Sequence, residues 1–173
     1  MKPSRARTFR LDVDLDDSID MIAKKERLSV NQVANKAFRR YVEWDKAPTN
    51  RGLVSVPSIL LVKLMAGQTE EKAHDLGRWA GRELFLPNIK AGYPTLSLER
   101  VEKMLRMLGE YGGRFTFDHT IDAGKHIITL GQNMGRNWSI YYAGAMEAVF
   151  EGFLGKQFNE TISDNICVIE FEM

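Results

Sequence analysis

The stretch "RTFRLDVDLDD", residues 7–17, alternates apolar and polar side chains near the start of the chain. This alternation, with Phe9, Leu11 and Val13 on one side, predicts a β-strand with one buried face. No second strand-like run or hairpin turn follows, because the next pattern is helical and continues to about Trp44. A lone strand leaves its backbone N–H and C=O groups unpaired, so the sequence predicts that a strand outside this segment pairs with it.

Two amphipathic helices are predicted after this strand. Asp12 or Asp14 can cap the first helix through a side-chain oxygen, and the helix is expected to end near Arg27. Ser29 is a good N-cap for the second helix, whose apolar residues recur at the i, i+3, i+4 spacing. That stripe consists of Val30, Val33, Ala34, Ala37, Phe38, Tyr41 and Val42.

Residues 1–47 form a segment that buries too little apolar surface to be stable alone. A chain of this size usually needs a metal, a disulfide or a partner subunit, and the segment offers neither a metal motif nor a cysteine. A second copy solves both problems, since two antiparallel strands form a ribbon and four helices close over its apolar face. The missing strand is therefore predicted to be the same strand of another subunit, in an intertwined β-α-α homodimer.

The stretch "RTFRLDVDLDDSIDMIAKKERLSVNQVANKAFRRYVEW" resembles the ribbon-helix-helix family of DNA-binding proteins, which includes the Arc and MetJ repressors. The resemblance implies double-stranded DNA as a partner and base contacts from Thr8 and Arg10, with Ala6 or Asp12 added according to where the strand ends. It also implies that the amides opening the second helix hold a backbone phosphate. Those amides belong to Ser29, Val30 and Asn31.

One position departs from the pattern of that family. Many of its members carry Gly just before the Leu-Ser pair, where the turn between the helices favours positive φ. This sequence has Arg27 there. We interpret the difference as a cost to the turn geometry, compatible with the same fold.

The basic residues gather at the start of the chain. Residues 1–50 hold 11 Lys and Arg against 8 Asp and Glu, a balance of +3, whereas residues 51–173 hold 13 against 15, a balance of −2. The total of +1 gives no global field toward nucleic acid. The first ten residues carry four basic side chains and no acid, so Lys2 and Arg5 are expected to contact DNA phosphates; the alternative is a solvated cluster.

Residues 45–52, "DKAPTNRG", are predicted to be a linker, and residues 53–173 a second, α+β domain with an antiparallel sheet. Its expected order is ααα-ββ-α-ββ. The first three helices are expected to begin at Ser58, Thr69 and Ser97, and to end at Ala66, at Pro87, and at Gly109 or the Gly112-Gly113 pair. A hairpin with an Asp-Ala-Gly-Lys turn, a helix over residues 136–156, and strands over 158–163 and 166–172 complete the domain.

This second domain more faintly resembles the 4-vinyl-reductase domain, whose fold is shared by small subunits of the TRAPP vesicle-trafficking complex. The likeness is greatest at "YYAGAMEAVFEGFLGKQFNETISDNICVIEFE". It implies binding of a small apolar or aromatic molecule. Members often carry cysteines near the final hairpin, whereas Cys167 is the single cysteine here, so a bound metal is not expected.

The helix over residues 136–156 is unusually aromatic. Its apolar face is expected to be either core and subunit interface or the wall of a ligand pocket. The residues singled out are Trp138, Tyr141, Tyr142, Met146 and Phe150, with small residues at Ala143, Gly144, Ala145 and Ala148 for close approach of another element.

The residues that could bind a metal or act in catalysis are scattered. His74, His119, His126 and Cys167 form no His-x-His or Cys-x-x-Cys motif, so no metal and no cofactor are predicted. A two-residue hairpin loop would put His119 and His126 diagonally on one sheet face, and a three-residue loop would put them on opposite faces. No nucleophile elbow or paired-acid constellation occurs, so no catalytic residues are assigned.

These observations lead to one functional hypothesis and two alternatives. A single cysteine suits a reducing cytoplasm, and the longest aliphatic run, residues 59–62, is too short to cross a membrane. We expect a cytoplasmic transcriptional regulator that binds DNA as a homodimer or tetramer, with the second domain dimerising or sensing a ligand. The alternatives are an antitoxin-like protein whose second domain binds a partner protein, and an enzyme tethered to a DNA-binding arm.

Overall fold

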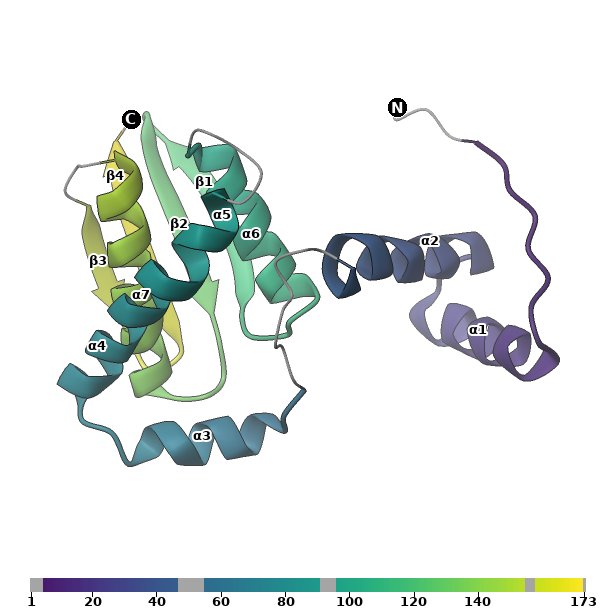
Figure 1. Ribbon diagram of the computed structural model, residues 1–173, viewed down its shortest axis with the longest axis horizontal. Coiled ribbons are helices and arrows are strands. Elements are labelled where there is room, and N and C mark those ends of the chain that lie inside the picture. Colours follow the sequence, from purple (N-terminus) through teal and green to yellow (C-terminus); the bar gives the residue numbers. More distant parts are fainter. Residues whose placement is uncertain (1–4, 47–54, 91–95, 155–157, 173) are drawn as a thin grey trace. The chain divides into compact units, whose positions relative to one another are not determined.

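The computed structural model describes residues 5–46, 55–90, 96–154 and 158–172 (Figure 1). The chain divides into two units, Met1–Ala47 and Pro48–Met173. Lys2 and most of the predicted linker over residues 45–52 lie outside the described residues.

The N-terminal unit begins with a segment that has no regular secondary structure. Residues 5–12 are exposed and form no strand, and helix α1 begins at Val13, the last residue of the expected strand. A strand needs hydrogen bonds from a neighbouring strand, and residues 5–46 of this unit contain no strand that could supply them. The predicted ribbon-helix-helix module is therefore not shown by the single chain.

Helix α1 (Val13–Glu26) ends where the sequence indicates, but it begins without the expected side-chain cap. Asp12 is the N-cap residue and its carboxylate makes no capping hydrogen bond, while Asp14 lies inside the helix, so the predicted cap is wrong. At the other end Arg27 adopts φ 57°, in the left-handed region. The Leu28 amide donates to the Ala23 carbonyl at 2.9 Å, which closes the helix in the manner usually served by Gly.

Helix α2 (Val30–Arg40) starts at the predicted cap. The Ser29 hydroxyl accepts from the Gln32 amide, and the Gln32 side chain accepts from the Ser29 amide at 2.8 Å, so both halves of a capping box are present. A π-helical turn, η1 (Tyr41–Asp45), continues α2 to one residue beyond the expected end near Trp44.

The C-terminal unit is a mixed α and β unit with one four-stranded antiparallel sheet in the order β1-β2-β4-β3. Its elements follow the expected order. They are α3 (Ser58–Ala66), α4 (Glu70–Ala80), η2 (Gly81–Phe85), α5 (Leu86–Lys90), α6 (Leu98–Glu110), β1 (Thr116–Asp122), β2 (Lys125–Gly131), α7 (Arg136–Leu154), β3 (Asn159–Ile162) and β4 (Ile166–Glu172). Helix α7 packs on β3 and β4, and α6 packs on β1, so these helices cover a sheet face (Figure 1).

The β1-β2 hairpin has a two-residue loop, the shorter of the two that the sequence left open. Ala123 and Gly124 both have positive φ, 47° and 85°, as a type I′ turn requires. The resulting register pairs His119 with Ile128 and Ile121 with His126. The two histidines therefore lie diagonally on one face of the sheet, as expected for the shorter loop.

The predicted stop at Pro87 is wrong. Helix α4 continues through the π-helical turn η2 into α5, which ends at Lys90. Proline lacks the amide that an α-helix would bond to the carbonyl four residues earlier. The wider turn ahead of Pro87, where the Leu86 amide donates to the Gly81 carbonyl, lets the chain absorb that loss without ending the helix.

The third predicted helix, α6, begins where it was expected to, and its end agrees with the second of the two expected stops. Ser97 is its N-cap residue, although the hydroxyl makes no capping hydrogen bond. The helix passes through Gly109 and ends at Glu110, shortly before the Gly112-Gly113 pair, and Gly113 has φ 60°.

The core of the C-terminal unit lies between the sheet and α7. The buried face of the sheet is built from cross-strand partners, Ile128 with Ile169 and Leu130 with Cys167, and all four side chains are buried. Helix α4 lies against α7, and the two backbones approach closely at Gly77 of α4 and Gly144 of α7. None of the helices in the described ranges is long and apolar enough to cross a membrane.

Candidate functional site

The expected DNA-contacting side chains lie on the segment before α1. Arg5, Thr8 and Arg10 are all exposed. Phe9, which lies between Thr8 and Arg10 in the sequence, instead contacts Phe38 of α2, with ring centroids 5.3 Å apart. If the segment paired as a strand, neighbouring side chains would point to opposite sides, and Thr8 and Arg10 would then lie on the side away from α2.

The N-terminal unit has little core of its own. Among its described residues, the apolar side chains that are buried are those of Ala23 and Val33. The large apolar side chains that stay exposed come from the segment, from α1, and from α2 and its π-helical extension. They are Phe9, Leu11, Val13, Leu15, Met21, Ile22, Val30, Phe38, Tyr41 and Val42.

The three amides predicted to hold a phosphate are not equivalent. The Ser29 amide is engaged with the Gln32 side chain at 2.8 Å, so a phosphate contact there would require Gln32 to move. Val30 and Asn31 are the first two residues of α2, and first-turn amides have no acceptor within their own helix. The side-chain oxygen of Asn31 accepts from the Asn35 side chain at 3.0 Å.

The five aromatic-helix residues lie on α7, and the structure buries most of them. Tyr142, Met146 and Phe150 are almost fully buried, Tyr141 is 8% exposed, and Trp138 is half-buried. The Phe150 ring lies 4.8 Å from that of Phe171 on β4, so this part of the face packs on the sheet of its own unit.

Tyr142 is the polar anchor of this aromatic cluster. Its hydroxyl donates to the Arg114 carbonyl at 3.3 Å, and its ring meets Phe115 edge to face at 5.1 Å. Burial raises the pKa of Tyr142 far above its ordinary value, so the phenol stays protonated and remains a donor. The Trp138 indole likewise donates, to the Leu61 carbonyl at 3.3 Å.

The two histidines of the hairpin contact each other and a carboxylate from α6. Nε2 of His119 lies 3.0 Å from Nδ1 of His126, and Nδ1 of His119 lies 3.0 Å from a carboxylate oxygen of Glu102. His126 also stacks on Phe171, with centroids 5.1 Å apart. This chain of contacts joins α6 to the first, second and fourth strands.

The structure gathers no metal-ligand set from the four candidates singled out in the sequence. Across residues 5–46, 55–90, 96–154 and 158–172, no group of three or more His, Cys, Asp and Glu side chains could hold a metal ion. His74 pairs with Glu147 on α7, apart from the hairpin histidines. Cys167 is buried, and burial raises the pKa of its thiol to about 12, so it stays protonated at neutral pH.

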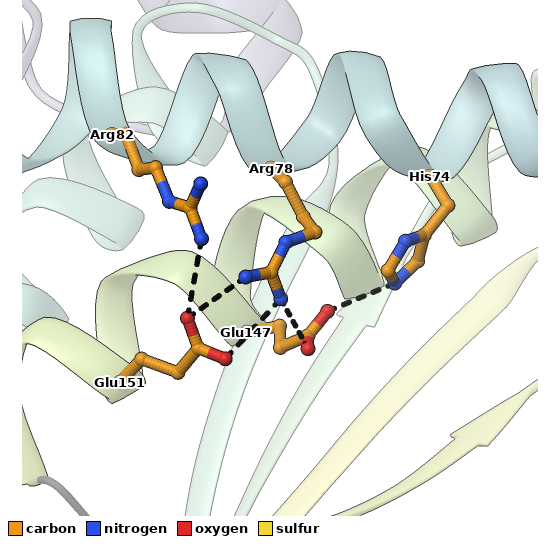
Figure 2. Close-up of polar contacts among 5 residues, drawn as sticks. All are labelled: His74, Arg78, Arg82, Glu147 and Glu151. Atoms are coloured by element: carbon orange, nitrogen blue, oxygen red, sulfur yellow. Dashed lines mark hydrogen bonds and ion pairs between the residues drawn. The ribbon is translucent and has the colours of Figure 1, made fainter.

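A ladder of ion pairs between α4 and α7 was not anticipated (Figure 2). The Arg78 guanidinium bonds Glu147 and donates to Glu151 at 2.9 Å, and these carboxylates raise its pKa. Arg82 lies 3.5 Å from Glu151. His74 Nε2 lies 3.0 Å from the second carboxylate oxygen of Glu147, which is buried.

The spacing of these residues carried a usable signal. His74, Arg78 and Arg82 recur every four residues, as do Glu147 and Glu151, so each set lies on one face of its helix. Opposite charges on two such faces indicate helices that lie side by side. The ladder joins two helical segments through ion pairs, so we assign it a structural role.

Comparison with known proteins adds no family to these observations. No protein-family model matches the chain, and no curated protein matches it either. Both family resemblances therefore remain expectations drawn from the sequence.

Proposed function

We propose that the protein is a DNA-binding transcriptional regulator that acts as a homodimer or a higher homo-oligomer. The observation that carries the proposal is the bare apolar surface of the N-terminal unit. A soluble unit rarely leaves so many large apolar side chains exposed, and contiguous exposed apolar surface marks an interaction site. The partner that fits is a second copy, because it supplies both a strand to pair with and an equivalent apolar face.

The arrangement of the segment before α1 supports the ribbon. Phe9 already lies on α2, so pairing of two such segments would place their apolar sides on the helices and their polar sides outward. Thr8 and Arg10 would then be available to base edges in the major groove, where Arg can bond guanine through two donors. The amides of Val30 and Asn31, together with Lys2 and Arg5, would hold the flanking phosphates.

The first prediction concerns assembly. The wild-type chain should sediment as a dimer, and the melting temperature of its N-terminal helices should rise with protein concentration, because folding of this unit is coupled to association. Phe9→Arg should abolish the dimer, since it puts a charge where the ribbon meets α2. Analytical ultracentrifugation of both proteins over a range of concentrations measures this.

The matched control for this test is Thr8→Ser. It changes the neighbouring, outward side chain and should leave the oligomeric state unchanged. A wild-type chain that sediments as a monomer with concentration-independent melting would contradict the proposed function.

The second prediction concerns sequence readout. Arg10→Ala should relax base preference and cost roughly 1–3 kcal/mol on the preferred duplex, because it removes a base contact. Arg5→Ala should instead weaken binding to all duplexes alike and flatten the salt dependence, as loss of a phosphate contact does. Selection of preferred duplexes from a random pool, followed by titrations at several salt concentrations, separates the two effects. Equal losses on preferred and random duplexes for Arg10→Ala would show that Arg10 serves only to neutralise phosphate.

The C-terminal unit is proposed to assemble subunits rather than to catalyse a reaction. The burial of Tyr142, Met146 and Phe150 within this unit favours a packed interior over an open pocket. A small apolar ligand remains the alternative that follows from the faint vinyl-reductase resemblance.

A further inference from the structure

Helix α3 is attached to the C-terminal unit in an unusual way. Two residues of α7 donate to backbone carbonyls of this part of the chain: Asn137 donates to Met65 in α3 at 3.1 Å and to Gln68 just after α3 at 2.9 Å, and Trp138 donates to Leu61 in α3. The Met65 side chain is buried. The rest of the helix projects beside the unit (Figure 1).

The exposed side of α3 is aliphatic. We call it the α3 stripe, and it consists of Val56, Ile59, Leu60 and Leu64, which are 42%, 63%, 47% and 61% exposed. Leu60 and Leu64 are four residues apart on α3 and so lie on one face, with Ile59 beside them, and Val56 lies just before the helix begins. Surface helices normally turn such a face toward the core. Here Met65 is buried and Leu61 and Val62 are half-buried, while the aliphatic side chains of the α3 stripe are left exposed.

We propose that the α3 stripe is the contact between the C-terminal units of two copies of this chain, an inference that rests on the proposed dimer of the N-terminal unit. The small size of the stripe favours a second copy of the chain over a separate partner protein. Four half-exposed aliphatic side chains supply a patch of a few hundred Å², whereas a free-standing interface needs roughly 800 Å² from each partner. A separate partner protein would be held too weakly by the stripe alone.

A tethered copy does not face that limit. Dimerisation of the N-terminal unit holds two C-terminal units at a local concentration that can reach the millimolar range, at which a small patch suffices. The stripe also suits a two-fold contact, in which the same surface meets itself. The single charged residue of α3, Lys63, is exposed, and its long side chain can keep its ammonium in water at the edge of such a contact.

The test is cross-linking of the full chain with a short bismaleimide reagent. Val56→Cys, Leu60→Cys and Leu64→Cys are made singly, because residues near a two-fold axis lie opposite their own copies. The native Cys167 gives little background, since it is buried and protonated. Lys103→Cys, at an exposed position on α6, is the matched control.

We expect at least one stripe variant to give a covalent dimer that Lys103→Cys does not give. The cross-link should be lost when Phe9→Arg is added, because the copies are then no longer tethered. A chain that sediments as a dimer while no stripe variant cross-links would overturn this inference and leave the proposed function intact. Cross-linking that persists with Phe9→Arg would overturn the tethered arrangement, and a monomeric wild-type chain would overturn the inference together with the proposed function.

Discussion

Gly77→Ala should lower the free energy of unfolding of the C-terminal unit by about 3 kcal/mol or more, the upper end of the range for overpacking. A Cβ on Gly77 would lie 2.9 Å from the Tyr141 carbonyl carbon and 3.0 Å from the Ala145 amide nitrogen, and closer still to the Tyr141 oxygen. These are backbone atoms of α7, so relief requires the two helices to move apart. The better helix propensity of Ala offsets only about 1 kcal/mol of that cost.

The matched control for Gly77→Ala is Gly67→Ala. Gly67 follows α3, has φ −85°, and nothing lies within 4 Å of the Cβ position. The control should change stability by less than about 0.5 kcal/mol, as surface substitutions usually do. Circular-dichroism melts of the full chain at one fixed protein concentration measure both. A Gly77→Ala protein that melts with the wild type would show that α4 and α7 do not approach at backbone distance.

The close approach of α4 and α7 shows what periodicity can predict and what it cannot. The small residues of α7 indicated that another element comes close to this helix. The structure shows this at Gly144, where an added Cβ would lie 3.2 Å from the Arg78 amide nitrogen. The sequence could not name α4 as that element, because the pairing of two helices depends on the whole chain path. Gly77 and Gly81 are four residues apart and so lie on one helix face, but this spacing can be interpreted as a contact site only once the partner helix is known.

The errors in the predicted helix boundaries have a common cause. Pro and Gly usually end helices; the sequence predicted a stop at Pro87 and gave Gly109 as one of two alternative stops for the next helix. In the structure a π-helical turn accommodates Pro87, and Gly109 lies against the Phe115 backbone, where a Cβ would come within 2.7 Å of its carbonyl oxygen. Local propensity therefore gave way to tertiary contacts, which a single sequence does not display.

The N-terminal unit presents the opposite case. Its local signals were strong, and the Ser29 cap and the positive φ at Arg27 are both present. The predicted strand is not formed in the single chain, and in the proposed dimer its hydrogen-bond partners would belong to another molecule. The candidate DNA-contacting residues share that dependence, since Thr8 and Arg10 would gain a defined orientation within the proposed ribbon.

Tyr142→Ala is expected to destabilise the C-terminal unit by about 3–5 kcal/mol, the cost of truncating a large aromatic side chain in a core. Tyr142 is 3% exposed and its ring has Phe115, Trp138 and Tyr141 as neighbours at 5.1–5.8 Å. Tyr142→Phe keeps the ring and removes only the hydrogen bond to the Arg114 carbonyl, so it should cost about 1 kcal/mol. The difference in free energy of unfolding between the two variants gives the contribution of ring packing, separate from that of the hydrogen bond.

The same residue decides between a packed interior and a ligand pocket. If the aromatic face of α7 is filled by its own unit, small aromatic and lipid-like compounds should leave the melting temperature of the wild type unchanged, because no site is open to them. A compound that binds the native state would raise that temperature by mass action, and through reciprocal linkage it would also shift DNA affinity. We expect no such shift in a thermal-shift screen of the wild-type chain. A compound that raises the melting temperature of the wild type and loses this effect in Tyr142→Phe would instead assign the C-terminal unit to ligand sensing, with the Tyr142 hydroxyl as a contact.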